Sequence, residues 1–223
     1  MSSRGLRALW WKDLRLQGGA LIFVLGFEAI LLVGLVGFFP ERFDQTAGLF
    51  LQAIACLGTF EMTYRIAAAD ERRKSILFLK TLPTTVGQIY GAKFVLVVLG
   101  VVVNAAWLTG VFLATRLLGP WTLPSLGLDV LVLGATLQLL LAITLASFAF
   151  MTGSERAIWV PLPLVLLVGV AYVWLRFSTP TVGESVLAPV MEQWILVSVS
   201  AVGLALLLVL LTLGRVRRRT TLA

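Results

Sequence analysis

Long apolar runs alternate with short polar segments along the whole chain. A helix needs about 20 mostly apolar residues to cross the hydrocarbon core of a bilayer. Six stretches meet that requirement, at residues 20–39, 47–68, 94–117, 129–151, 157–175 and 194–214. Charged residues, prolines and glycines collect between them, as in residues 40–44 and 119–120. The pattern predicts an all-α fold, a polytopic membrane helix bundle with six transmembrane helices, in one domain over residues 1–223.

Residues 1–18 differ from the apolar runs because they are short and charged. Leu6, Leu9, Trp10 and Leu14 recur at helical spacing, and basic residues take other positions. This pattern favours an N-terminal interfacial helix along the inner leaflet, with the tryptophans at the depth of the lipid headgroups. A basic leader before the first span is the alternative that the pattern leaves open. The segment lacks the continuous apolar region of a cleavable signal peptide.

The composition agrees with a membrane domain and excludes several kinds of covalent, catalytic and metal-binding site. Hydrophobic residues make up 59% of the 223 residues and charged residues 13%, whereas soluble domains carry about 25% charged residues. The mean hydropathy is +0.99. A single cysteine, Cys56, excludes an internal disulfide, and the absence of histidine excludes Ser–His catalysis and histidine-ligated zinc or haem.

The net charge of +7 is explained by topology. With the N-terminus inside, all but three of the 18 basic residues fall in cytoplasmic segments, and the exceptions are Arg42, Arg116 and Arg176. Cytoplasmic loops carry an excess of Lys and Arg, so both chain ends are predicted to be cytoplasmic. No soluble domain presents these charges to nucleic acid, which is therefore not expected as a partner.

The cytoplasmic loop at residues 70–93 is the longest polar interruption. A charge cluster, Asp70 to Lys74, precedes an apolar run that stops at Leu82-Pro83, because proline disfavours helix in the residue before it. Thr84 or Thr85 is expected to cap a second short helix that runs towards Lys93. Exposed apolar side chains of this kind indicate a partner surface. In the alternative, Leu77 and Phe78 pack back against the inner ends of the bundle.

Two segments carry a resemblance to a known family. Residues 71–93 contain an acidic cluster, a Leu-x-x-Leu-Pro element and a Gly-x-Lys, and residues 9–15 read Leu-Trp-Trp-Lys-Asp-Leu-Arg. They resemble the coupling loop and the elbow helix of type-2 permeases of ATP-binding-cassette exporters, which also have six spans. The resemblance implies that these residues contact a separate ATPase subunit: Glu71, Arg72, Ser75, Phe78, Leu79, Leu82, Pro83, Thr84 and Ile89.

The same resemblance implies the partners. The chain has no phosphate-binding Gly-x-x-x-x-Gly-Lys-Ser/Thr loop, so ATP and Mg would be bound by the partner ATPase and no cofactor by this chain. A half-transporter of six spans is expected to pair with a second permease copy or a sister permease. The expected location is the bacterial cytoplasmic (inner) membrane, in contact with lipid.

Five polar residues fall inside the predicted spans, where a charge is costly and faces protein or water. They are Glu28, Glu61, Arg65, Asn104 and Gln138. Glu61 and Arg65 lie one turn apart and are expected to pair, and Asn104 and Gln138 are expected to bond between helices. Glu28 is expected to be protonated or paired rather than to act in transport. Gly26, Gly34 and Gly37 indicate close packing of the first span.

Residues 177–193 on the outer side are predicted to form re-entrant or interfacial helices, or else a plain extracytoplasmic loop. Two further functions stay open beside the permease. One is a haem-exporter-type permease of cytochrome maturation, and the other is a proton-coupled secondary transporter that uses Glu28 or Glu61. The latter predicts inverted repeats, which the sequence does not show. No nucleophile–base arrangement indicates an enzyme.

Overall fold

The computed structural model describes residues 3–38, 40–72, 85–118, 128–152 and 192–221. These residues form five α-helices and no strand. The helices are α1 (Ser3–Phe38), α2 (Pro40–Arg72), α4 (Val86–Leu118), α5 (Leu128–Thr152) and α8 (Trp194–Thr221). The predicted all-α fold is confirmed for this part of the chain.

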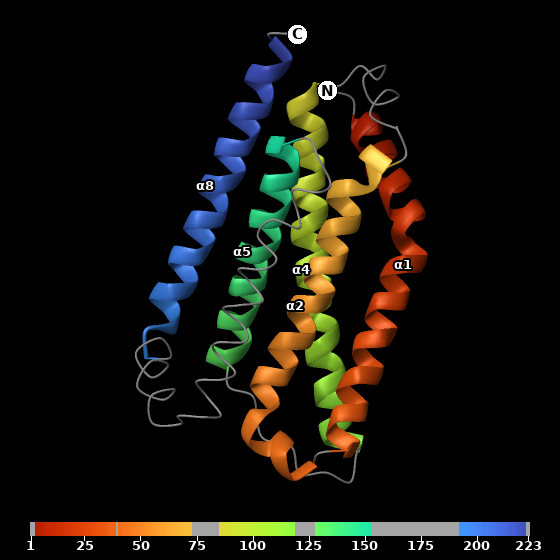
Figure 1. Ribbon diagram of the computed structural model, residues 1–223, viewed down its shortest axis with the longest axis vertical. Helices are drawn as coiled ribbons and strands as arrows, with labels where there is room; N and C mark the ends of the chain where they lie inside the picture. The colour runs from red at the N-terminus through yellow and green to blue at the C-terminus, as the bar shows by residue number, and fades with distance from the viewer. Residues whose placement is uncertain (1–2, 39, 73–84, 119–127, 153–191, 222–223) are drawn as a thin grey trace.

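The five helices run up and down along the bundle (Figure 1). Both chain ends lie at one end of the bundle, which we call the terminal end; the end of α2, the start of α4 and the end of α5 lie there too. By contrast, α8 starts at the opposite end, the far end. The end of α5 and the start of α8 therefore lie at opposite ends of the bundle. The predicted fifth span, residues 157–175, belongs to the interval between Thr152 and Trp194 and lies outside the described residues.

Three of the described helices are long and apolar enough to cross a membrane. Their apolar segments are Gly87–Leu118, Leu131–Thr152 and Trp194–Arg218, which match the predicted third, fourth and sixth spans. The apolar segment of α1 is shorter, Leu21–Gly34. α2 does not meet the criterion of length and hydropathy for a membrane span. The structure thus supports a membrane protein with several spans, and the number six is not confirmed by the described residues.

α1 is a single helix from Ser3 to Phe38, so the predicted interfacial segment 1–18 is not confirmed as a separate element. No proline interrupts this stretch. Only residue 39 separates α1 from α2, and α2 begins at Pro40, a residue favoured at the first helical position. Residues 40–44, which were placed between the first two predicted spans, form the first turn of α2.

The start of α4 has the cap that its sequence predicts, at Thr85. The carbonyl oxygen of Thr85 accepts bonds from the amides of Gln88 and Ile89 at 2.9 and 3.2 Å. The Gln88 side chain in turn accepts the Thr85 amide at 3.0 Å, as in a capping box. The expected second short helix of the loop is not separate, because Val86 to Lys93 form the first turns of α4.

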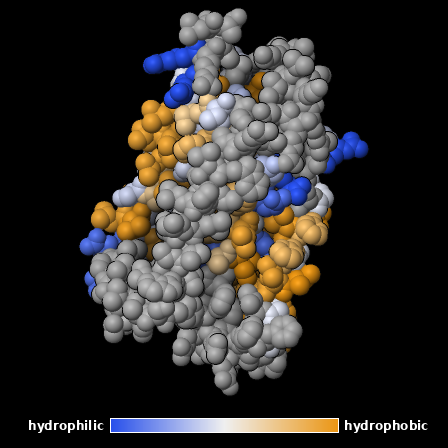
Figure 2. All heavy atoms as spheres, in the orientation of Figure 1, coloured by the Kyte–Doolittle hydropathy of each residue, from blue (hydrophilic) through white to orange (hydrophobic). Residues whose placement is uncertain are grey.

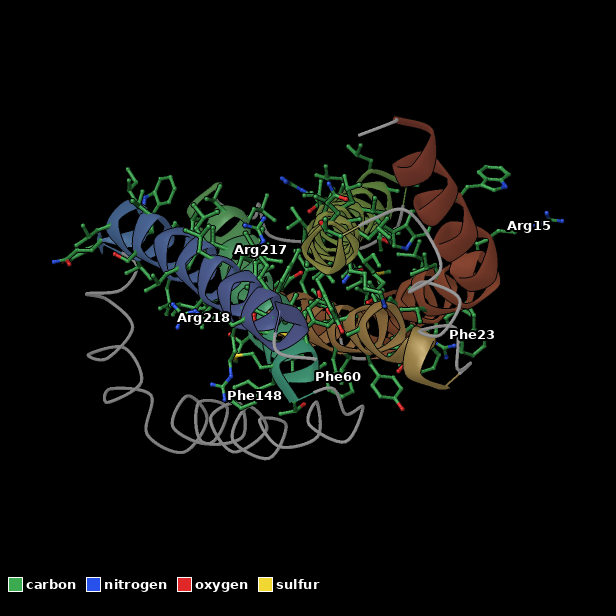
Figure 3. The ribbon with its side chains drawn as sticks, turned by 90° about the horizontal axis from the view of Figure 1, so that it is seen from above. Arg15, Phe23, Phe60, Phe148, Arg217 and Arg218 are labelled. Carbon is green, nitrogen blue, oxygen red and sulfur yellow. The ribbon has the colours of Figure 1, made fainter. Side chains whose placement is uncertain are left out.

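α4 packs against all four of the other described helices, and α2 has three neighbours. α2 packs against α1, α4 and α5, while α8 packs mainly against α5. Figure 3 shows the same order seen along the bundle, with α8 and α1 at opposite sides. Where α2 packs against these helices, its buried polar residues have protein groups rather than lipid as partners.

The outer surface of the bundle is apolar. Half or more of the side chain is exposed at Ile22 and Phe23 on α1, Val102 on α4, and Leu206 and Leu210 on α8. Orange patches in Figure 2 show such hydrophobic residues on the outside. A soluble monomer rarely exposes this much contiguous apolar surface, whereas a bilayer covers it.

Two apolar clusters fill the interior, one above the other. The cluster towards the far end contains Leu32, Leu51 and Phe112, and the cluster towards the terminal end contains Ile66, Val97 and Phe150. Along each of α1, α2, α4 and α5, a buried polar residue falls beside or between these clusters. We call these residues the polar layer; they are Glu28, Thr59, Asn104 and Gln138.

Candidate functional site

Hydrogen bonds connect three helices through the polar layer. The Asn104 amide nitrogen on α4 donates to the Ala55 carbonyl oxygen at 3.0 Å and lies 3.3 Å from the Thr59 hydroxyl on α2. The Thr59 hydroxyl lies 3.4 Å from Oε1 of Gln138 on α5. Gln138 donates to Gln52, again on α2, at 2.9 Å. The prediction that Asn104 and Gln138 bond between helices is confirmed, with α2 as the common partner.

Two glycines make room for these polar side chains. A side chain at Gly58 on α2 would begin where the Glu28 carboxyl group lies, and a side chain at Gly134 on α5 would begin where the Gln52 amide lies. By contrast, a Cβ at Gly26 or Gly34 would meet nothing within 4 Å. The prediction that Gly26 and Gly34 mark close packing is therefore wrong within the described chain.

A small cavity lies beside the polar layer, between α2, α4 and α5. Gln52, Thr109 and Gln138 line it together with apolar side chains. Its volume of about 20 Å³ is room for about one water molecule. Binding sites for small molecules measure about 300–1,000 Å³, so this cavity is no substrate pathway.

Glu61 and Arg65 form the predicted ion pair one turn apart on α2. The distances from Glu61 Oε1 are 2.6 Å to Nη2 and 2.7 Å to Nε of Arg65. Both side chains are at least one-third exposed, at 35% and 42%. The pair thus lies away from the buried polar layer, and the pairing prediction is confirmed.

At the terminal end, Lys93 connects three helices. Its ammonium group is buried and donates to the Ile66 carbonyl oxygen on α2 at 3.1 Å. It also lies 5.9 Å from the centre of the Phe150 ring on α5, within the range of a cation–π contact. Phe150 further contacts Tyr90 and Phe94 on α4, at ring distances of 4.8 and 5.1 Å. These contacts hold together the helix ends that flank residues 73–84.

The end of α8 contacts the start of α4 at the same place. Nε of Arg217 lies 2.9 Å from the point where a Cβ of Gly87 would be. Figure 3 shows Arg217 between the two helices. Gly87 therefore leaves the space that a basic side chain of the C-terminal segment occupies.

The residues predicted to contact an ATPase are described only in part. Glu71 and Arg72 lie in the last turn of α2, and Ile89 is buried in the second turn of α4. Ser75, Phe78, Leu79, Leu82, Pro83 and Thr84 lie outside the described residues, as do nearly all of residues 177–193. Their proposed roles stay predictions.

Several contact residues were missed by the sequence analysis. Thr59 and Gln52 are polar residues inside the predicted second span, and that position was the available signal. For Gly58 and Gly134 the signal was absent, because glycines on outer and inner helix faces look alike in the sequence. Lys93 was placed at the end of the cytoplasmic loop at residues 70–93, yet its side chain is buried.

Comparison with known proteins agrees with this architecture. A family model described as ABC-2 family transporter protein matches residues 8–213. No curated protein and no solved structure matches the chain. The match covers all five described helices apart from a few terminal residues, and with them the polar layer and both flanks of residues 73–84. The chain therefore belongs to the ABC-2 family of transporter membrane proteins.

Proposed function

We propose that the chain is the permease subunit of an ATP-binding-cassette exporter, which pairs with a second permease and couples to a separate ATPase subunit. The family match over residues 8–213 carries this proposal. ATP and Mg are bound by the ATPase, and the pair of permeases forms the pathway. The complex lies in the bacterial cytoplasmic membrane with both ends of the chain in the cytoplasm.

The arrangement of the helix ends supports coupling through residues 73–84. Both chain ends, the end of α2 and the start of α4 share the terminal end of the bundle (Figure 1). Arg15 on α1 and Arg215 and Arg218 on α8 are exposed in the parts of their helices nearest this end. By the excess of basic residues in cytoplasmic segments, the terminal end is the cytoplasmic one. An ATPase in the cytoplasm therefore reaches residues 73–84.

Pairing of permeases is supported by the packing inside one chain. Buried side chains fill the described bundle, and the cavity beside the polar layer holds about one water molecule. A substrate pathway has no room inside this part of the chain. It is better formed between two permeases than through one.

The coupling proposal is tested by a double substitution in residues 73–84. We expect Leu79→Glu with Leu82→Glu to leave membrane insertion intact but to abolish co-purification of the ATPase subunit, because two charges replace apolar side chains of a docking surface. Leu117→Glu with Leu118→Glu makes the same change at the exposed far end of α4 and is the matched control. Co-purification is measured by quantitative mass spectrometry after mild detergent extraction.

The outcomes separate the proposal from its rivals. Loss of the ATPase in the first variant but not in the control supports coupling through residues 73–84. Equal ATPase recovery in both variants sinks that assignment. Transport that persists without any ATPase and disappears in Glu28→Gln would instead favour a proton-coupled transporter.

A further inference from the structure

The Glu28 carboxyl group has no hydrogen-bond partner among the described residues. Its side chain is 2% exposed, and both carboxyl oxygens are buried. Asn104 Oδ1 is also buried without a partner. These three oxygens lie at the junction of α1 with α2 and α4. If Glu28 is ionised, none of the three can donate a hydrogen bond, because each is an acceptor only.

Among the residues that the structure describes, the groups beside this carboxyl are uncharged. On α2, Gly58 leaves the space that the carboxyl fills, and the point where its Cβ would lie is 3.2 Å from the Asn104 amide nitrogen of α4. That nitrogen is already directed at Ala55 and Thr59. Cys56, on α2, is the other titratable group near this level of the helix. The Glu61–Arg65 pair and the Lys93–Ile66 bond lie further along towards the terminal end.

The small cavity between α2, α4 and α5 does not border the carboxyl. That cavity is lined by Gln52 and Gln138 on the other side of α2, and neither Glu28 nor Gly58 borders it. An isolated, desolvated carboxylate is so unfavourable that the group takes up a proton instead. Protonation also turns one of the carboxyl oxygens into a donor, for which Asn104 Oδ1 is an unused acceptor.

We propose that Glu28, Gly58 and Asn104 form a proton-binding site within the membrane, in which Glu28 is a neutral acid. The proton holds α1 against α2 and α4, and its loss places an unpaired charge in this junction. The junction also contains a bond from the Trp107 indole of α4 to the Leu25 carbonyl oxygen of α1, at 2.9 Å. The inference concerns one chain alone and does not depend on an ATPase.

Infrared spectroscopy of the full chain in lipid bilayers tests the site. We expect the wild-type minus Glu28→Gln spectrum at neutral pH to show the carbonyl band of a neutral carboxylic acid. The matched control is Glu61→Gln, which should remove only ionised carboxylate bands because Glu61 is paired with Arg65.

A spectrum of Glu28 with only ionised carboxylate bands at neutral pH overturns the proposal, since the carboxyl must then be neutralised by a bound cation. If Glu28→Gln fails to insert, Glu28→Asp keeps the acid, and a shift of the neutral band identifies the residue. An unshifted neutral band, or none, contradicts the site in that case.

Discussion

Replacing Phe150 with alanine is expected to lower the free energy of unfolding by about 3 kcal/mol, at the low end of buried Phe→Ala changes. Phe150 is 4% exposed and contacts Tyr90, Lys93 and Phe94. The truncation leaves a cavity in the terminal-end cluster and removes the ring beside the buried ammonium group. We expect a loss at the low end of the range because lipid, rather than water, surrounds much of the unfolded chain with which the folded state is compared. Thermal unfolding in detergent, followed by tryptophan fluorescence, measures the loss.

Phe148→Ala is the matched control on the same helix. Phe148 is 37% exposed and points to the outer side of α5 (Figure 3). Its truncation should change the free energy of unfolding by about 0.5 kcal/mol or less. Equal losses in the two variants would show that Phe150 does not connect α4 and α5 as the structure indicates.

The second large effect is expected from Gly58→Leu. The new side chain would begin at the position of the Glu28 carboxyl, so α1 must move away or Glu28 must turn into an apolar environment. Overpacking of a filled interior costs about 1–3 kcal/mol. The measurement is again the free energy of unfolding in detergent or lipid, and we expect a lower yield of folded protein as well.

The control for Gly58→Leu is Gly26→Leu, because a Cβ there meets nothing within 4 Å. Both changes gain the same helix propensity, so the difference between them reports packing alone. Adding Glu28→Ala to Gly58→Leu removes the overlapping carboxyl and should recover part of the stability. No recovery in this double variant would contradict the placement of Glu28 against Gly58.

The transmembrane character could be predicted because it depends on long apolar runs, and Gly87–Leu118 and Trp194–Arg218 match the predicted spans. The same argument identified Glu28, Asn104 and Gln138, since polar residues inside an apolar run need partners within the protein. Their partners could not be predicted. Which residues of α2 face α1, α4 or α5 depends on helix rotation, and a helix that packs against three neighbours lacks a single clear apolar face.

The ends of the helices were the other weak point. Continuity of α1 through residues 3–18 depends on where the chain meets the membrane surface, which local pattern does not determine. A cap at Thr84 or Thr85 was predictable because threonine is favoured just before a helix, and the bond from the Thr85 amide to Gln88 shows that Thr85 takes this position. Burial of Lys93 was not predictable, because its partner, the Ile66 carbonyl, is a backbone group that every residue possesses.

The proposed permease works with a separate ATPase. The most direct measurement is mild extraction of the tagged wild-type chain from its native membrane, followed by mass spectrometry of the intact complex. We expect an ATPase subunit with a Gly-x-x-x-x-Gly-Lys-Ser/Thr loop in fixed ratio to the permease. A stable, transport-competent assembly that contains the permease and no ATPase would contradict this expectation.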